Sequence, residues 1–542
     1  MALHPNTPLI ERSGFLLSLV TLLLILVWLI VYIAWPKPFW TMQDDYAYLA
    51  LAHALNLESR LRDGVYYGDE GLLGHPGIPF YFVSWLCLRA AALFAGAQDA
   101  IAYGLERPQG FLFATRVAAG AIAMTAVAAT WRILHPLPPL WRTVAVGAFF
   151  AAGPESFYYG LTFLGNETFA LPLAALLFLA LKRIVAVPPE HIGPWLILGA
   201  VSALGYAVKV LYLDVLAAAW AVACVDAWWY HRHSSAVFIV ESVKRVVAVS
   251  VAFVGVLAPL LLAVLGEEGF DYLMSFHWRV FTRAAHYGSG DASFVALSNI
   301  AQAVSHFIHE NPVMPLLVLP AIALLAAMLV TQLRRGAMDR KNLLWCTAAL
   351  TALLVTLAAV FKHFATHYLP AVSALLPFVM AIVLTRRSMP LRRAAAVVTV
   401  LCLVVTLNRV YDHFERNTRL LALIAQDERA ISAMPLAPGE ARLWTYNVAG
   451  EHMAKGFIAH SSGVSSIAAR LKDPQGVELS SFAGIDRPYR YVVLDKNYFP
   501  TTEAVRLTQG SLEPTQSLNV KLNPDDQLHE FNRVIVVERR TQ

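Results

Sequence analysis

Long apolar runs constrain this chain more than any other feature of its sequence. The first extends from Gly14 to Trp35, and runs of similar character recur up to about residue 410. A helix needs roughly 20 apolar residues to cross a hydrocarbon core of about 30 Å. Hydrophobic residues make up 58% of the 542 residues and charged residues 15%, against about 45–50% and about 25% in soluble domains. The sequence therefore predicts a polytopic α-helical membrane protein.

We expect about eleven transmembrane helices. The first run is interpreted as a retained anchor rather than a signal peptide, because no secretory cleavage site follows it. The expected spans are residues 14–35, 110–131, 141–161, 166–183, 194–209, 210–230, 244–265, 313–333, 342–361, 367–385 and 394–410.

Basic residues cluster in the loops between alternate spans, which predicts that these loops are cytoplasmic. The N-terminus is then inside, and the segments 36–109 and 267–312 are outside. The basic positions are Lys182–Arg183, Arg232 to Arg245, Arg334–Arg335 with Arg340–Lys341, and Arg386–Arg387 with Arg392–Arg393.

The external segment 36–109 is expected to carry juxtamembrane helices. Residues 42–55 place Tyr48, Leu51 and Leu55 on one helical face, which predicts an amphipathic helix lying on the membrane. The apolar stretch 78–96 cannot be a single crossing without reversing the charge rule, and Arg89 interrupts it. We expect it to lie in the interface or to re-enter the outer leaflet.

Residues 411–542 differ in character from the rest. They are polar, and the segments 489–495 and 533–538 alternate in the period of a strand. The sequence thus predicts two domains, a transmembrane domain over 1–410 and a soluble α/β domain over 411–542. An odd number of crossings places the second domain outside.

Two adjacent carboxylates follow the first span. Either Asp44 or Asp45 could cap the helix after it, a role worth about 1 kcal/mol, but capping needs only one of them. A catalytic or metal-binding role is the alternative that we favour for at least one. The same external segment contains Asp69, Glu70 and His75.

A set of mainly cationic residues falls at the predicted outer ends of spans. Charged groups there are costly unless paired or solvated, which makes them candidates to bind an anionic phosphate. Snorkelling to lipid headgroups is the alternative for any one of them. Arg116, inside a predicted span, needs a partner such as Glu167. The candidates are Lys209, Lys362, His363 and His367, and Arg279 and Arg283 together with His277 and His286.

Three short motifs occur in a familiar order. Asp44-Asp-Tyr-x-Tyr-x-x-x-Ala follows the first span, His75-Pro-Gly-Ile-Pro comes next, and Lys362-His-x-x-x-His-Tyr-Leu-Pro370 precedes a late span. This pattern resembles the GT-C superfamily of polyprenyl-phosphate-sugar-dependent glycosyltransferases, and looks most like relatives of protein mannosyltransferases and aminoarabinose transferases. The order of features matches over nearly the whole chain. The family often has Asp-Glu and Pro-Pro where this chain has Asp-Asp and Pro-Gly, which leaves the sugar open.

The resemblance implies a GT-C-like bundle, with Asp44 as general base and Asp45 as second choice. An apolar groove would hold the polyprenyl chain, and the cationic corners would hold the phosphate, with Tyr368 as a further substrate-binding candidate. Direct displacement would invert the anomeric centre. The implied partners are a polyprenyl-phosphate-linked sugar donor and a glycan, lipid or protein acceptor. The implied location is the bacterial cytoplasmic (inner) membrane, with the C-terminal domain periplasmic. No cofactor follows from the motifs, and a divalent metal ion is left open.

Two other functions fit parts of the pattern. A transporter or flippase of lipid-linked sugars would use the same apolar bundle, but the acids sit at the outer boundary rather than at mid-membrane. A scaffold presenting the C-terminal domain would not need so many spans. The basic residues form no stripe, so nucleic acid is not an expected partner, and the four cysteines form no Cys-x-x-Cys pair.

Overall fold

The computed structural model describes residues 46–63, 77–162, 164–282, 300–335, 339–362, 365–386, 389–438, 440–444, 477–479, 489–496, 502 and 525–539. The chain divides into two compact units. The first contains the described residues of 73–80 and 116–410, and the second contains those of 36–72, 81–115 and 411–542.

Eight helices within the described residues are long and apolar enough to cross a membrane. The chain is therefore a multi-pass membrane protein. The predicted span 14–35 lies outside the described residues, and the helix over the predicted span 194–209 is apolar but shorter than the eight. The eight are Pro108–Ile133, Asn166–Ala186, Val210–His231, Ser235–Glu267, Val313–Gln332, Arg340–Lys362, Thr366–Thr385 and Met389–Ser432.

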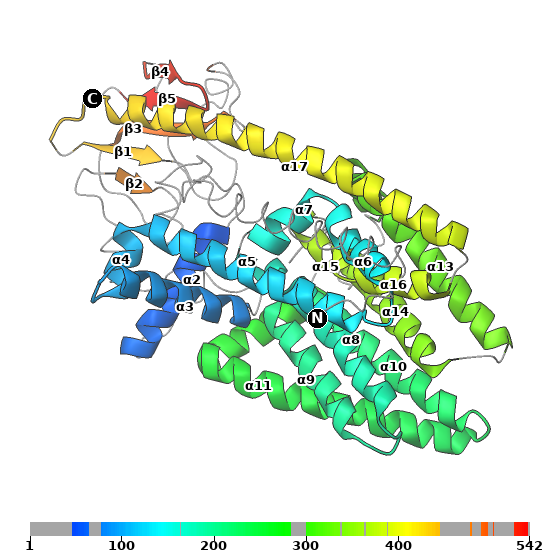
Figure 1. Cartoon of the computed structure of the whole chain (residues 1–542). Helices are drawn as coiled ribbons and strands as arrows, with labels where there is room; N and C mark the ends of the chain where they lie inside the picture. Colours follow the sequence, from blue (N-terminus) through cyan, green and yellow to red (C-terminus); the bar gives the residue numbers. More distant parts are fainter. Residues whose placement is uncertain are drawn as a thin grey trace. The chain divides into compact units, whose positions relative to one another are not determined.

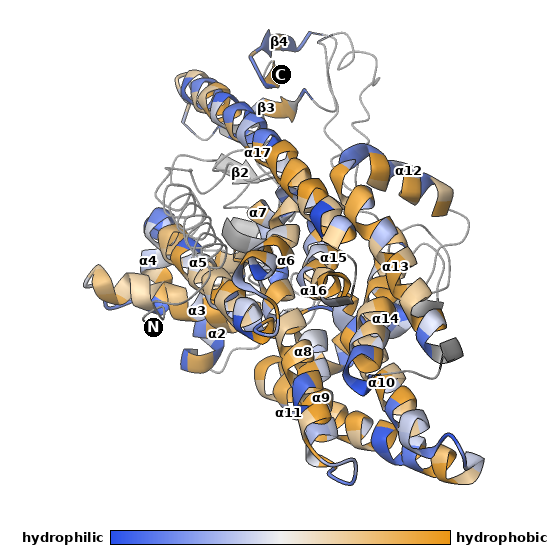
Figure 2. Cartoon of the chain, turned by 45° about the vertical axis from the view of Figure 1, so that its right-hand side comes forward, coloured by the Kyte–Doolittle hydropathy of each residue, from blue (hydrophilic) through white to orange (hydrophobic). Residues whose placement is uncertain are grey.

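The first unit is a bundle of closely packed helices (Figure 1). Helix α9 (Gly193–Val208) packs against α8 (Ala170–Ala186), α10 (Leu213–His231) and α11 (Ser235–Thr282), and α10 packs against α14 (Arg340–Lys362). Apolar residues cover most of these helices (Figure 2). The same unit also contains α6 (Pro139–Ala151), α12 (Ile300–Glu310), α13 (Val313–Arg335), α15 (Leu369–Ser373) and α16 (Leu376–Arg386).

One end of this bundle carries a buried charge network. Asp226, near the end of α10, accepts from Arg245 of α11 and from Arg340 of α14, each at 2.7 Å. Arg340 also donates to the carbonyls of Ile184 and Val185, at the end of α8. Arg245 and Arg340 were expected to be loop charges that mark the cytoplasm. They instead neutralise a carboxylate within the bundle, so their positions reflect packing as well as topology.

The predicted span 141–161 is not one helix. Helix α6 ends at Ala151, and Gly153 follows with φ 149 before the short helix α7 (Pro154–Phe157) and the π-helical turn η1 (Tyr158–Thr162). A Cβ at Gly153 would lie 2.0 Å from Nδ2 of Asn311. Only glycine fits this conformation and this contact, and Pro154 cannot continue the hydrogen-bond ladder of α6.

Two other helices extend beyond their predicted spans. Helix α11 continues past a kink at Gly266 (φ 73) to Thr282, where an external loop was expected. Helix α17 (Met389–Ser432) passes residue 410, the predicted domain boundary, without a break. Its later turns carry more polar side chains than its first ones (Figure 2), so hydropathy marks where the apolar part ends but not where the helix ends.

In the second unit, α2 (Tyr46–Asp63) packs with α4 (Ala100–Glu106). The expected half-exposed amphipathic helix is not what the structure shows, because residues 50–59 of α2 are buried on every side. Glu58 of α2 accepts from Arg89 at 2.7 Å and from Trp85 at 2.8 Å, both on α3 (Ile78–Phe94). Arg89, which interrupts the apolar stretch 78–96, is thus paired.

The C-terminal part of the second unit contains a five-stranded sheet of order β2-β1-β3-β5-β4. The first three strands in this order are parallel, and the β3–β5 and β5–β4 pairs are antiparallel. Ile431 of α17 packs with Tyr491 and Val536 in the core of this region. The strands are β1 (Ala441–Trp444), β2 (Val477–Leu479), β3 (Tyr489–Asp495), β4 (Gln527–Glu530) and β5 (Val534–Glu538).

Candidate functional site

A buried ion pair lies at the end of the bundle opposite to Asp226. Lys209 Nζ lies 2.6 Å from Glu167 Oε1, and both side chains are almost fully buried, at 3% and 1% exposure. Glu167 lies in the turn η2 (Asn166–Phe169) that leads into α8, and Lys209 lies between α9 and the turn η3 (Val210–Tyr212). Since α9 returns along α8, the pair joins the start of one helix to the end of the next.

A tyrosine ring contacts the ion pair, and a histidine and a second tyrosine extend the contact. The Lys209 ammonium lies 4.1 Å from the centroid of the Tyr368 ring, which is a cation–π contact. The His367 ring lies 4.1 Å from that of Tyr368 and 6.1 Å from that of Tyr159 in η1, edge to face in both cases. His367 and Tyr368 belong to the turn η5 (Thr366–Tyr368), and the charge of His367 also acts on Glu167.

The segment before α3 is bonded to the residue that precedes Lys209. The backbone N–H of Gly77 donates to the carbonyl of Val208, which directly precedes Lys209, at 3.1 Å. Gly77 is the middle residue of the His75–Pro79 motif. The sequence motifs of the external segment and of the Lys209 corner are therefore joined by a backbone hydrogen bond.

The pairing changes what Lys209 can do. Lys209 was one of the candidates to bind a phosphate, and its charge is balanced by Glu167 at hydrogen-bond distance. A buried ammonium with a carboxylate partner has little net charge to offer an anion. Lys209 instead fixes the Glu167 carboxylate through one oxygen, and Glu167 is bound by Lys209 rather than left to serve Arg116.

The other sequence candidates lie as follows. Lys362 is buried at the last position of α14, a few residues before η5. Arg116 is buried in α5 (Pro108–Ile133). Arg279 is half-buried on the extension of α11, where its Nε donates to the Ser275 carbonyl. Asp44, Asp45, Asp69, Glu70, His75, Arg283, His286 and His363 lie outside the described residues.

His277, a candidate for a phosphate contact, bonds to a neighbouring helix. Its Nδ1 is hydrogen-bonded to the Tyr206 hydroxyl of α9, and both side chains are buried. The pair packs the extension of α11, beyond the kink at Gly266, against α9. His277 therefore holds a helix in place.

The sequence reasoning also missed Glu155, a buried acid next to the break after α6. Glu155 of α7 accepts from Asn311 Nδ2 at 2.8 Å, and the same amide group donates to the Ala152 carbonyl at 3.0 Å. Asn311 precedes α13, and its Oδ1 accepts from the Met314 amide at 3.1 Å. In the sequence, Gly153-Pro154-Glu155 interrupts an otherwise apolar run. This interruption was the signal of the helix break after α6.

Among the residues that the structure describes, no group of three or more His, Cys, Asp or Glu side chains is arranged to hold a metal ion. The adjacent acids Asp44 and Asp45 lie outside that part of the chain.

The chain was compared with protein families, curated proteins and solved structures. No protein-family model and no curated protein matches the sequence. One solved structure similar to this chain is the apo form of the Archaeoglobus fulgidus oligosaccharyltransferase, with a TM-score of 0.41 and 11% sequence identity. The match covers 88% of this chain and 70% of that chain.

Proposed function

We propose that this chain is a membrane glycosyltransferase. It moves a sugar from a polyprenyl-phosphate donor to a glycan, lipid or protein acceptor at the outer face of the bacterial cytoplasmic membrane. One observation supports this most. Candidates from three separate segments of the sequence lie together at one place in the bundle, and they are Glu167, Lys209, His367 and Tyr368.

The chemistry of such a donor fits the features of the first unit. Its long apolar tail needs an apolar surface between or beside membrane helices, and the eight candidate spans offer one. Its phosphate needs cationic or hydrogen-bonding groups when it departs, and Lys362 and His367 are the candidates nearest the end of α14. Its sugar needs polar groups that are shielded from water, which the surroundings of Glu167 supply.

The proton of the acceptor must be taken up by a base. We assign this role to Asp44, with Asp45 as the alternative, because a carboxylate can act as general base toward a hydroxyl. The donor carbon is attacked directly by the acceptor oxygen while the phosphate leaves, so the anomeric configuration inverts.

The test uses purified protein in lipid nanodiscs. Labelled polyprenyl phosphates carrying mannose, glucose, galactose or arabinose are incubated with candidate acceptors, and release of polyprenyl phosphate is measured. We expect Asp44→Asn to lose at least about a hundredfold in turnover, because asparagine caps a helix as well as aspartate does but takes no proton. Thermal unfolding of this variant should match the unmodified protein.

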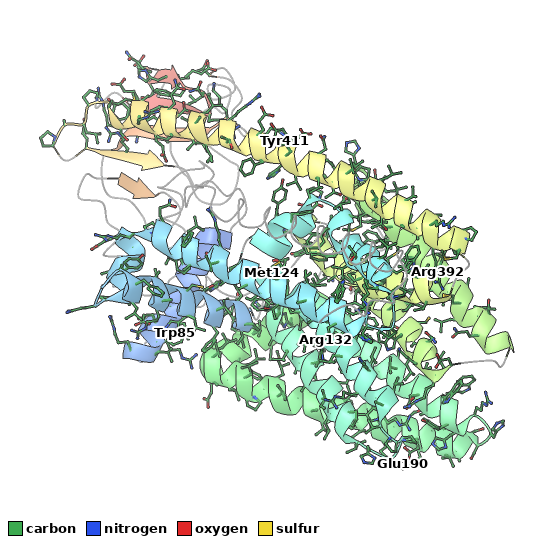
Figure 3. All side chains as sticks on the ribbon, viewed as in Figure 1. Trp85, Met124, Arg132, Glu190, Arg392 and Tyr411 are labelled. Atoms are coloured by element: carbon green, nitrogen blue, oxygen red, sulfur yellow. The ribbon has the colours of Figure 1, made fainter. Side chains whose placement is uncertain are left out.

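Glu190→Gln is the matched control, because Glu190 is an exposed acid in the loop between α8 and α9 (Figure 3). It should turn over normally. If Asp45→Asn alone is inactive, the two carboxylates exchange roles. Normal turnover by both variants would remove the acid pair from catalysis, and movement of intact donor across the bilayer without turnover would favour a flippase instead.

A further inference from the structure

Three buried oxygen atoms near the Lys209–Glu167 pair have no hydrogen-bond partner in the described part of the protein. They are Oε2 of Glu167, Oδ1 of Asn166 and the hydroxyl of Tyr212. The exposed fractions of these residues are 1%, 8% and 3%. A buried polar atom left unsatisfied costs about 1–3 kcal/mol, so three in adjacent turns indicate that a group outside the described residues supplies the partners.

The three residues come from two turns that the ion pair holds together. Asn166 and Glu167 are neighbours in η2, and Tyr212 ends η3, where its N–H donates to the Lys209 carbonyl at 2.9 Å. The charge of Glu167 also acts on the Tyr212 hydroxyl. Lys209 binds only Oε1 of Glu167, which fixes the carboxylate and leaves Oε2 available.

Charge decides what kind of ligand these atoms would accept. A phosphate would be repelled by Glu167, and a cation would be repelled by Lys209, which lies 2.6 Å from Glu167. A neutral ligand with several hydroxyl groups meets neither penalty. Carboxylate and amide oxygens accept from hydroxyls, and a phenol can both donate and accept.

We infer that Asn166, Glu167 and Tyr212 bind hydroxyl groups of the sugar carried by the donor. This inference rests on the proposed function and adds to it a place for the sugar, separate from the groups that hold the phosphate. Lys209 is then a positioning residue, which orients the carboxylate without touching the ligand.

The test compares two Tyr→Phe variants. Tyr212→Phe removes a hydroxyl without a partner in the described protein, so its melting temperature without ligand should stay the same or rise. Tyr158→Phe is the matched control, because the Tyr158 hydroxyl donates to the Val410 carbonyl at 3.0 Å. Its melting temperature should fall. Binding is measured as thermal stabilisation by bare polyprenyl phosphate and by the same lipid carrying mannose, glucose or galactose.

We expect the unmodified protein to bind at least one sugar-bearing lipid more tightly than the bare lipid. Tyr212→Phe should weaken that binding about 3- to 10-fold, as loss of a neutral hydrogen bond does, and leave binding of the bare lipid unchanged. Tyr158→Phe should change neither affinity. Asn166→Ala provides a second variant and should reproduce the selective loss.

Other results overturn the inference. If Tyr212→Phe binds the sugar-bearing lipid as tightly as the unmodified protein, the three oxygens are satisfied by water. If the unmodified protein binds both lipids equally, the site does not bind the sugar. The proposal that the donor is a polyprenyl phosphate then still stands. If neither lipid stabilises the protein, the proposed function fails and this inference fails with it.

Discussion

Lys209 and Glu167 are both more than nine-tenths buried, so each charge needs the other as its partner. Removing one partner leaves an uncompensated charge in a medium of low dielectric, whereas removing both leaves none. The Lys209–Glu167 pair joins the start of α8 to the turn after α9, so its loss would also loosen the place where Tyr368 and His367 lie.

We predict that Glu167→Gln and Lys209→Met each lower the free energy of unfolding by about 3–5 kcal/mol. The double variant Glu167→Gln/Lys209→Met should recover most of this loss, because no buried charge remains. Thermal unfolding followed by tryptophan fluorescence measures the three variants. The exposed pair Glu415–Arg419 of α17 is the control, and Glu415→Gln should change stability by less than about 1 kcal/mol. A double variant no more stable than the single ones would show that the pair is not the cause.

Lys362 is the cation that we propose for the donor phosphate, because it ends α14 a few residues before His367 and Tyr368. We predict that Lys362→Ala weakens donor affinity and turnover together, by roughly ten- to a hundredfold, because a charge-assisted contact contributes about 1.5–3 kcal/mol. Lys362→Arg should recover part of the loss, since the planar guanidinium cannot occupy the ammonium position unchanged. Donor titrations give both quantities. Donor kinetics equal to those of the unmodified protein would move the phosphate site toward Arg279 or Arg283.

Individual polar residues at the ends of apolar runs could be singled out from the sequence. Glu167, Lys209 and His367 stand out for that reason, since a charge there is costly without a partner. The partners of these residues could not be predicted from the sequence. Lys209 is 42 residues from Glu167, and Arg340 is 114 residues from Asp226, so only the packing of helices reveals which charges meet.

At the scale of elements, hydropathy predicts where apolar helices run but not where helices begin, break or end. The predicted span 394–410 is part of a helix that ends at Ser432, and 244–265 is part of one that reaches Thr282. In Figure 3, Arg392 lies near the start of α17 and Tyr411 well before its end. Polar residues continue a helix as readily as apolar ones do, so a change in composition is no helix terminus.

Helices α9 and α11 approach each other closely at Gly199. A Cβ at this position would lie 2.3 Å from the Val249 carbonyl oxygen and 2.8 Å from the Ala252 Cβ. Small residues allow this kind of contact between membrane helices. We predict that Gly199→Ala lowers the free energy of unfolding by about 1–3 kcal/mol, although alanine favours a helix by about 1 kcal/mol over glycine.

Gly255→Ala, in α11, is the matched control for Gly199→Ala, because nothing lies within 4 Å of a Cβ there. Its melting temperature should stay the same or rise. Equal effects of the two substitutions on melting temperature would mean that α9 and α11 can separate slightly at no cost.

At the scale of the whole molecule, the first unit has two chemically different ends. Helix α14 begins at Arg340, which bonds to the end of α8, and its 23 residues span about 34 Å. It ends at Lys362, shortly before His367 and Tyr368, and Lys209 bonds Glu167 at the start of α8. The predicted cytoplasmic residues Arg245 and Arg340 thus lie at one end of this unit, and the predicted external corners lie at the other. A count of apolar residues does not reveal the helix break at Gly153, between α6 and α7. The number of predicted membrane crossings nevertheless depends on that break.

The last prediction tests which end faces outward. We expect the C-terminal sheet to be periplasmic and the loop between α8 and α9 to be cytoplasmic, since the basic residues Lys182 and Arg183 precede that loop. Gln527 of β4 and Glu190 of the loop are both exposed. With the four native cysteines replaced by alanine, Gln527→Cys should react with a membrane-impermeant maleimide in intact spheroplasts, and Glu190→Cys should react only after lysis.

Labelling of Glu190→Cys before lysis together with protection of Gln527→Cys would invert the topology and place the Lys209–Glu167 cluster on the cytoplasmic side. Labelling of both before lysis would place both positions outside, so the segments between residues 190 and 527 would cross the membrane an even number of times, whereas the seven spans predicted between them are odd in number. The crossings from α9 to α17 would then have to be recounted.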